Sequence, residues 1–135
     1  MGADLLTAML IKPAGKKLDY EKALEVAENL TEDDIPWEVW DNLFQGDPPA
    51  FGVSEQELLD AKEMVIDAIK YVKEAVEEGK RTVNVWAGVL GYDIIITGET
   101  SWGDTPEGVD EFNYVYGCKK VREALGLVDY FEQGG

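Results

Sequence analysis

Apolar residues recur at two different spacings in the middle of the chain, and each spacing predicts a different element. Between residues 54 and 78 they lie three or four positions apart, as in an amphipathic helix. Ser54 and Glu57 have the spacing of a capping box at the start of this helix, and Gly79 supplies a residue that can end it. Its apolar stripe comprises Leu58, Ala61, Val65, Ala68, Ile69, Val72 and Val76.

A strand pair is predicted directly after this helix. Residues 82–90 alternate between apolar and polar positions, and residues 92–97 form a β-branched run. We expect the two segments to pair as antiparallel strands, with Gly91 at the turn. Gly88 marks either a bulge in the first strand or the turn itself.

The N-terminal part of the chain has shorter and less regular patterns. The apolar run at residues 4–11 predicts a buried strand, although a helical fragment also fits a run of this length. Asp19 is placed to cap a helix that continues to Leu30. Acids and Pro36 then open a second helix. Its large apolar residues recur at helical spacing: Trp37, Trp40, Leu43 and Phe44. The two tryptophans are expected to pack into the core.

The C-terminal part of the chain predicts a broken helix. Asp104 or Thr105 is placed to cap it, with Pro106 at the first helical position. Gly117 interrupts the helical pattern, and a second helical segment follows it. Residues 129–135 are expected to fray.

Length and composition fit one domain. The chain has 135 residues, of which 45% are hydrophobic. We therefore expect a single α+β domain over residues 1–135. Its small, mainly antiparallel sheet is expected to pack against the long amphipathic helix and the C-terminal helices.

The charge of the chain narrows the kinds of partner it can bind. Twenty-eight acids oppose twelve bases, for a net charge of −16, and residues 19–47 alone hold ten acids and one lysine. A field of this sign repels nucleic acid and anionic membranes, so we expect no direct binding to either, and it attracts basic proteins. The acids nearest the two tryptophans of the second helix are candidate contact residues: Asp33, Asp34, Glu38 and Asp41.

Residue types that several common reactions need are missing. The chain has no histidine, and its one cysteine, Cys118, excludes an intramolecular disulfide and a multi-thiol metal site. Ser101 does not lie in a G-x-S-x-G motif, and no phosphate-binding glycine loop is present. No apolar run has the length of a membrane span and no signal-peptide pattern opens the chain, so the cytoplasm is the expected compartment. We predict a binding protein rather than an enzyme, without cofactor or metal.

Aromatic and hydroxyl side chains around the strand pair are further candidates for binding. Trp86 falls on the polar face of its strand, opposite to Val83 and Val85, where an indole ring favours contact with a ligand. Trp102 lies in the loop after the second strand. The oxygen-bearing residues of that loop either bind a hard cation or, as we prefer, cap the next helix. The candidates in this part of the chain are Trp86, Tyr92, Ser101, Trp102, Asp104 and Thr105.

Residues 97–106, TGETSWGDTP, form a distinctive motif together with the tripeptide GYD at positions 91–93. The motif resembles one in small uncharacterised proteins of actinobacterial phages and plasmids, in which a strand leads through TGG and SWGD-[ST]-P into a helix. Glu99 departs from the second glycine of that pattern. The similarity covers about 35 residues, starting at Ala87. It implies an accessory role in phage or mobile-element biology and assigns no activity.

These observations leave three functions open. The preferred one is a non-enzymatic accessory protein that docks a basic host protein through an acidic, tryptophan-containing surface. By blocking a nucleic-acid or nucleotide site, it would act as an inhibitor or anti-defence factor. An alternative is a protein that sequesters a signalling nucleotide, with Trp86, Tyr92 and Trp102 stacking on the base and a helix N-terminus holding a phosphate. A second alternative is a hydrolase that uses loop carboxylates and a divalent cation.

Overall fold

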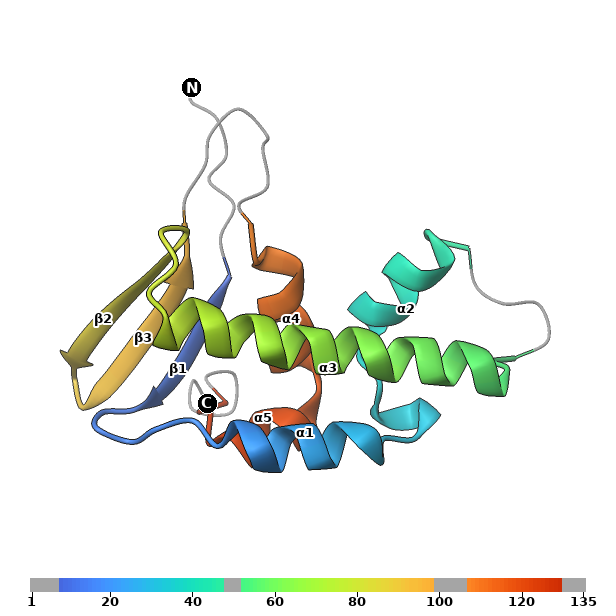
Figure 1. Ribbon diagram of the computed structural model, residues 1–135, viewed down its shortest axis with the longest axis horizontal. Helices are drawn as coiled ribbons and strands as arrows, with labels where there is room; N and C mark the ends of the chain where they lie inside the picture. The colour runs from blue at the N-terminus through green and yellow to red at the C-terminus, as the bar shows by residue number, and fades with distance from the viewer. Residues whose placement is uncertain (1–7, 48–51, 99–106, 130–135) are drawn as a thin grey trace, which may run out of the picture.

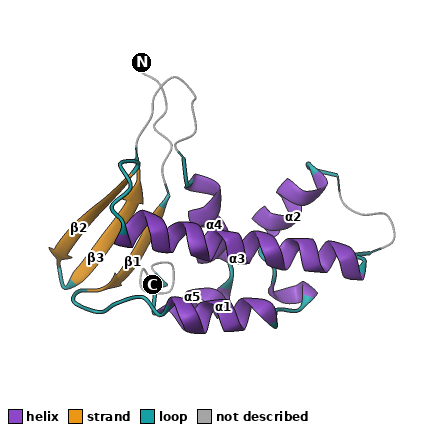
Figure 2. Ribbon diagram, viewed as in Figure 1, coloured by secondary structure: helices purple, strands orange, loops and turns teal. Residues whose placement is uncertain are grey.

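One long helix, α3 (Glu55–Glu77), forms the axis around which the other elements are arranged (Figure 1). An antiparallel sheet of three strands lies near one end of α3, and the short helix α2 (Trp37–Phe44) lies near the other (Figures 1 and 2). The structure is a computed structural model that describes residues 8–47, 52–98 and 107–129. It confirms the predicted α+β class, with a small sheet packed against one long helix and the C-terminal helices.

The helix starts follow local capping signals. Ser54 Oγ accepts a hydrogen bond from Glu57 N–H at 3.1 Å, and Glu57 Oε1 accepts one from Ser54 N–H at 2.9 Å, so the predicted capping box is confirmed. Asp19 Oδ1 accepts from Lys22 N–H at 3.1 Å, which caps the first helix as predicted. The remaining helices are α1 (Tyr20–Glu28), the 3₁₀ turn η1 (Glu32–Asp34), α4 (Val109–Gly117) and α5 (Lys119–Leu125).

The hydrophobic core lies along the apolar stripe of α3. The fully or almost fully buried residues of this helix are Ala61, Val65, Ala68, Ile69, Val72 and Ala75. Alanine recurs there every seven residues, and so small a side chain lets a neighbouring helix approach closely. α1 and α4 both pack against α3, and α5 packs against α1. Within the described ranges, no helix is both long and apolar enough to cross a membrane.

The sheet has the strand order β1-β3-β2, formed by β1 (Met9–Pro13), β2 (Val83–Val89) and β3 (Tyr92–Thr97). Both pairs are antiparallel, as predicted for residues 82–97, and β1 confirms a strand in the N-terminal apolar run. Leu10 and Ile95 lie opposite each other and are fully buried in the core.

Gly88 forms a bulge and not the turn of the hairpin. The register of β2 against β3 shifts between Trp86 and Val89, and Gly88 has a φ of +76° within that shift. Gly88 N–H donates to Asp93 Oδ1 at 3.0 Å, which fixes the bulge. The turn itself consists of Leu90 and Gly91, both at positive φ.

Two expectations for the C-terminal part need correction. α4 begins at Val109 and not at Pro106, because Gly108 precedes it with a φ of +93°, which is incompatible with a right-handed helix. A Cβ at position 108 would lie 2.7 Å from Cε1 of Tyr71, so only glycine lets the backbone pack this closely on the Tyr71 ring. The caps predicted at residues 104–106 lie outside the described residues. Asp129, expected in the frayed tail, accepts hydrogen bonds from Tyr116 Oη at 3.0 Å and Arg122 Nη2 at 2.9 Å.

The ion pair between Lys12 and Asp93 joins β1 to β3 at directly opposite positions, with 2.5 Å between Lys12 Nζ and Asp93 Oδ2. Hydrogen bonds from Lys12 and from Gly88 N–H lower the pKa of Asp93. A lowered pKa means that the stabilisation is present above the unfolded-state value of about 4 and is lost as the pH falls through the folded-state pKa.

We predict that Asp93→Asn lowers the free energy of unfolding at neutral pH and that the difference from the wild type shrinks below about pH 4. Urea unfolding of both proteins between about pH 2 and pH 7 measures this difference. Asp67→Asn, at an exposed position of α3, is the control and should change stability little. A deficit in Asp93→Asn that stays constant over this range would contradict the role assigned to the ion pair.

Leu90 is unusual because it is 92% exposed and has a φ of +51°, a conformation that strains side chains other than glycine and asparagine. We predict that Leu90→Asn raises the free energy of unfolding by about 1 kcal/mol. Thermal or urea unfolding measures the gain. Val89→Asn, at the neighbouring exposed position without positive φ, should give no gain, and an equal gain at both positions would show that strain is not the cause.

Candidate functional site

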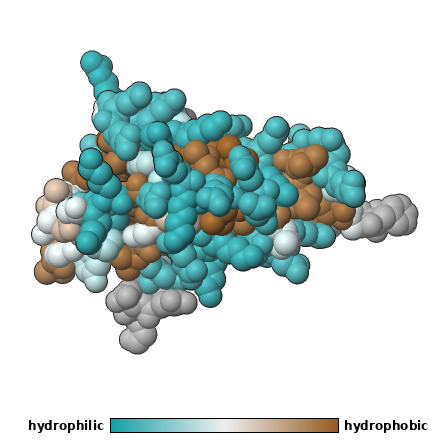
Figure 3. Space-filling model, turned by 60° about the horizontal axis from the view of Figure 1, so that its bottom comes forward, coloured by the Kyte–Doolittle hydropathy of each residue, from teal (hydrophilic) through white to brown (hydrophobic). Residues whose placement is uncertain are grey.

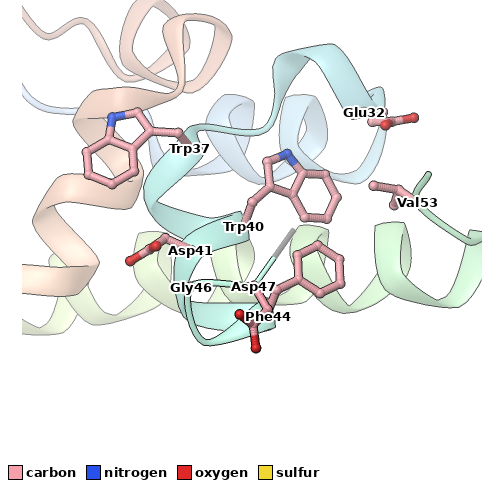
Figure 4. A pocket seen from close by; sticks show the side chains of 8 residues that line it. All are labelled: Glu32, Trp37, Trp40, Asp41, Phe44, Gly46, Asp47 and Val53. Atoms are coloured by element: carbon pink, nitrogen blue, oxygen red, sulfur yellow. The ribbon is translucent and has the colours of Figure 1, made fainter. Parts of the chain in front are cut away.

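A groove with a volume of about 360 Å³ runs beside α2 (Figure 4). α2 and the turn after it supply most of its walls. η1 and the segment before α3 add one residue each. The lining residues are Glu32, Trp37, Trp40, Asp41, Phe44, Gly46, Asp47 and Val53.

The groove exists because the apolar arc of α2 is wider than the core can cover. At 100° per residue, the arc from Val39 through Leu43, Trp40 and Phe44 to Trp37 spans about 160° of the helix. Val39, at one border, is 0% exposed, whereas Trp37, at the other border, is 71% exposed. Trp40 and Leu43 are half-buried and pack against the core. The prediction that Trp37 packs in the core is therefore wrong, and its indole ring forms part of an open surface.

The aromatic rings of the groove are arranged as a wall. Trp40 and Phe44, one helical turn apart, stack with 5.7 Å between ring centroids and 13° between ring planes. Figure 4 shows Glu32 and Val53 on the same side of α2 as these two rings, and Trp37 and Asp41 on its other side. The groove thus presents flat aromatic faces with carboxylates at their margins.

Local hydrogen bonds fix α2 and the turn that follows it. Asn42 Nδ2 donates to Tyr114 Oη at 2.5 Å, which ties α2 to α4. Gln45 ends the helix in the left-handed conformation, and Gly46 N–H donates to Asp41 C=O at 3.0 Å. Asp47 N–H then donates to Phe44 C=O at 3.0 Å. This bond holds the turn against the end of α2, and Gly46 and Asp47 line the groove there.

The groove is acidic, and its acids are not neutralised within the described parts of the chain. Glu32, Asp41 and Asp47 are exposed, and no basic residue is among the lining residues. The ion pairs among the described residues involve other acids: Asp34, Glu74, Asp93, Glu107 and Asp129. Three carboxylates beside aromatic faces form an environment that attracts an organic cation.

Of the acids predicted near the tryptophans, the structure places only Asp41 in the groove. Asp34 Oδ2 accepts from Thr31 N–H at 2.8 Å and from Lys120 Nζ at 3.0 Å, and these bonds lower its pKa, so its carboxylate serves the fold. Asp33 is exposed but is not a lining residue. Glu38 lies on the α4 side, where a Cβ at Gly117 would be 3.1 Å from its Oε1.

The other predicted site residues lie elsewhere. Trp86 pairs with Ile94 and, as predicted, points to the face of β2 opposite to Val83. It is 56% exposed and, like Tyr92, belongs to the hairpin, which Figure 1 shows at the far end of α3 from α2. Ser101, Trp102, Asp104 and Thr105 lie outside the described residues.

Sequence patterns alone did not indicate Glu32, Phe44, Asp47 and Val53 as one site. The sequence signal for part of this site is the helical spacing of Trp37 and Trp40, and the same spacing predicts packing in the core. Glu32 and Val53 come from separate segments, and only the tertiary fold brings them to α2.

The described residues offer little for covalent or metal chemistry. Cys118 is buried, and burial raises the pKa of its thiol, which disfavours the reactive thiolate. No group of three or more acidic or cysteine side chains within the described ranges is placed to hold a metal ion.

Comparison with known proteins gives no match for this chain. No protein-family model matches it, and no curated protein or solved structure does either. The chemistry of its own residues is therefore the basis for a functional proposal.

The orientation of α2 predicts opposite outcomes for two alanine substitutions on the same helix. Val39→Ala should lower the free energy of unfolding by about 2 kcal/mol, because it leaves a cavity in the core. Trp37→Ala removes a far larger side chain and should change stability by less than about 0.5 kcal/mol, because the ring is mostly exposed. Urea unfolding distinguishes the two, and a larger loss for Trp37→Ala would show that α2 is rotated differently.

Proposed function

We propose that this protein is a non-enzymatic binding protein that docks a basic segment of a partner protein in the groove beside α2. The observation that carries the proposal is the combination of open aromatic faces with three carboxylates that have no basic partner among the described residues. The resemblance of residues 97–106 to small phage and plasmid proteins supports a host protein as the partner. Docking there would block the partner's basic surface.

At short range, the groove suits a lysine or arginine side chain. The apolar stem of such a residue packs along the stacked faces of Trp40 and Phe44, and its charged head reaches a carboxylate at the margin. A cation over an aromatic face contributes about 0.5–2 kcal/mol, and more as water is excluded. Arginine has the additional advantage that its planar guanidinium stacks on an indole ring and pairs with a carboxylate in two hydrogen bonds.

At long range, the acidic half of the chain guides the partner to the groove. Residues 19–47, which include α1, η1 and α2, carry ten acids and one lysine. A concentration of like charge on one part of the surface raises the rate of association with a basic partner. Salt weakens this attraction, which at 0.1 M ionic strength decays over a distance of about 10 Å.

The same charges disfavour phosphate-bearing ligands in this groove. Three carboxylates would repel a nucleotide, so the groove gives no support to the nucleotide-sequestering alternative. Trp86 and Tyr92, the described residues suggested to stack on a base, lie in the hairpin and not beside the groove.

The proposal is tested with penta-arginine amide as a defined cationic probe, by calorimetry at low salt. The triple variant Glu32→Gln, Asp41→Asn, Asp47→Asn removes the groove charges. We predict that it weakens binding at least tenfold, about 1.4 kcal/mol or more. Trp40→Phe, which keeps an aromatic ring, should weaken binding less than Trp40→Ala.

The matched control is the triple variant Glu63→Gln, Asp67→Asn, Glu78→Gln, which removes the same charge from exposed positions on α3 and at its end. This variant should lose no more than about threefold, because it reduces only the general field. Equal losses in the two triple variants would mean that the probe follows net charge, and the groove would then have no specific role.

A further inference from the structure

A second surface lies near the opposite end of α3, where the sheet has one occupied edge and one free edge. The outer edge of β1 is occupied, because Val128 N–H donates to Ile11 C=O at 2.7 Å. β2 forms the other edge. Within the described ranges, the backbone groups of residues 84–89 form no hydrogen bond to another backbone group outside the ladder with β3. Val83 N–H, at the start of β2, donates to Lys80 C=O at 3.1 Å, so among the described residues the edge of β2 is open to another strand from residue 84 onward, and we call this the free edge.

The hydrogen-bond pattern of the sheet shows which residues of β2 face this free edge. Thr97 N–H donates to Ala8 C=O at 3.0 Å, on the β1 side of β3, and Gly98 N–H donates to Thr82 C=O, on the β2 side. In an antiparallel ladder the direction alternates from one residue to the next. The even-numbered residues of β2 up to Trp86 therefore bond to β3, and Val85 directs its N–H and C=O outward.

The free edge carries no charged side chain and no proline, two of the features that usually protect such edges. Proteins commonly place lysine, proline or another charged residue on an exposed edge strand. Residues 82–92 contain no charged residue and no proline, in a chain in which 30% of residues are charged. Val85 is 46% exposed, and the hairpin end of the molecule is mainly white and brown in Figure 3. Only the bulge at Gly88 interrupts the edge.

We propose that a second copy of this chain pairs with the free edge of β2. The two β2 strands run antiparallel about a two-fold axis that passes between the two copies of Val85, and the two sheets join into one. Identical antiparallel strands are self-complementary, as a two-fold interface requires. The pairing is separate from the groove and does not depend on its function.

Charge determines which surface a second copy can use, and it favours this edge. Each chain has a net charge of −16, so two copies repel each other wherever their acids meet. The hairpin is uncharged on its exposed positions and, as Figure 1 shows, lies far from the acidic region around α2. Contact through β2 therefore buries apolar side chains without bringing the two acidic regions together.

Sedimentation of the wild-type protein over about 1–500 µM, a range wide enough to detect a weak dimer, is the first test. We expect a concentration-dependent dimer. Val85→Glu, which places two like charges opposite each other at the axis, should shift the midpoint by at least tenfold toward monomer. Leu59→Glu, which makes the same kind of apolar-to-acidic change at an exposed site on α3, should leave the midpoint unchanged.

A cross-linking variant tests the register. Opposed residues in a hydrogen-bonded antiparallel pair have Cα atoms about 5.5 Å apart, within the range of a disulfide. Val85→Cys should therefore oxidise to a covalent dimer much faster than Leu59→Cys, and the native Cys118 is buried. A wild-type monomer over the whole concentration range, or equal cross-linking of the two cysteine variants, would overturn the proposal. Pairing of this edge with a strand from another protein, while the wild-type chain stays monomeric, would also overturn the proposal.

Discussion

Burial of a single stripe along α3 is the constraint on which the rest of the structure depends. Ala61, Ala68 and Ala75 lie seven residues apart on that stripe, and larger aliphatic side chains fill the spaces between them. α1, α2, α4 and β2 all pack against this helix. A helix of 23 residues is about 34 Å long, so it has room for unlike surfaces at its two ends. The separation of the sheet from α2 follows directly from this arrangement.

The two surfaces near the ends of α3 differ in whether their carboxylates are paired with basic residues. Around the sheet, Asp93 is paired with Lys12, and the exposed part of the hairpin carries no charge at all. Around α2, the carboxylates of the groove have no basic partner within the described parts of the chain. Unpaired carboxylates beside aromatic rings cost the fold little while water solvates them, and they become useful when a cation replaces that water. These two surfaces are the basis of the two proposals, a basic partner at the acidic groove and a second strand at the uncharged edge of the hairpin.

Most of the fold could be predicted from the sequence, because periodicity and capping are local signals. The helix from Ser54 and the hairpin after it formed as expected. The predicted start of α4 was wrong, because Gly108 packs against Tyr71, and a contact between residues so far apart in the sequence cannot be read from the local pattern of residues. The groove could be predicted only in part, because the apolar arc of α2 is continuous and only the tertiary fold shows that Val39 is buried and Trp37 is not.

The central claim is that the indole rings of α2 hold a cationic side chain. The indole N–H signals in a two-dimensional nitrogen–proton NMR spectrum report on each tryptophan separately, and single Trp→Phe variants assign them. On addition of penta-arginine amide, the account predicts that the signals of Trp37 and Trp40 move in a saturable way and that the signal of Trp86, at the other end of α3, stays in place. Saturable movement of Trp86 alone, or uniform small shifts of all four indoles, would contradict the account.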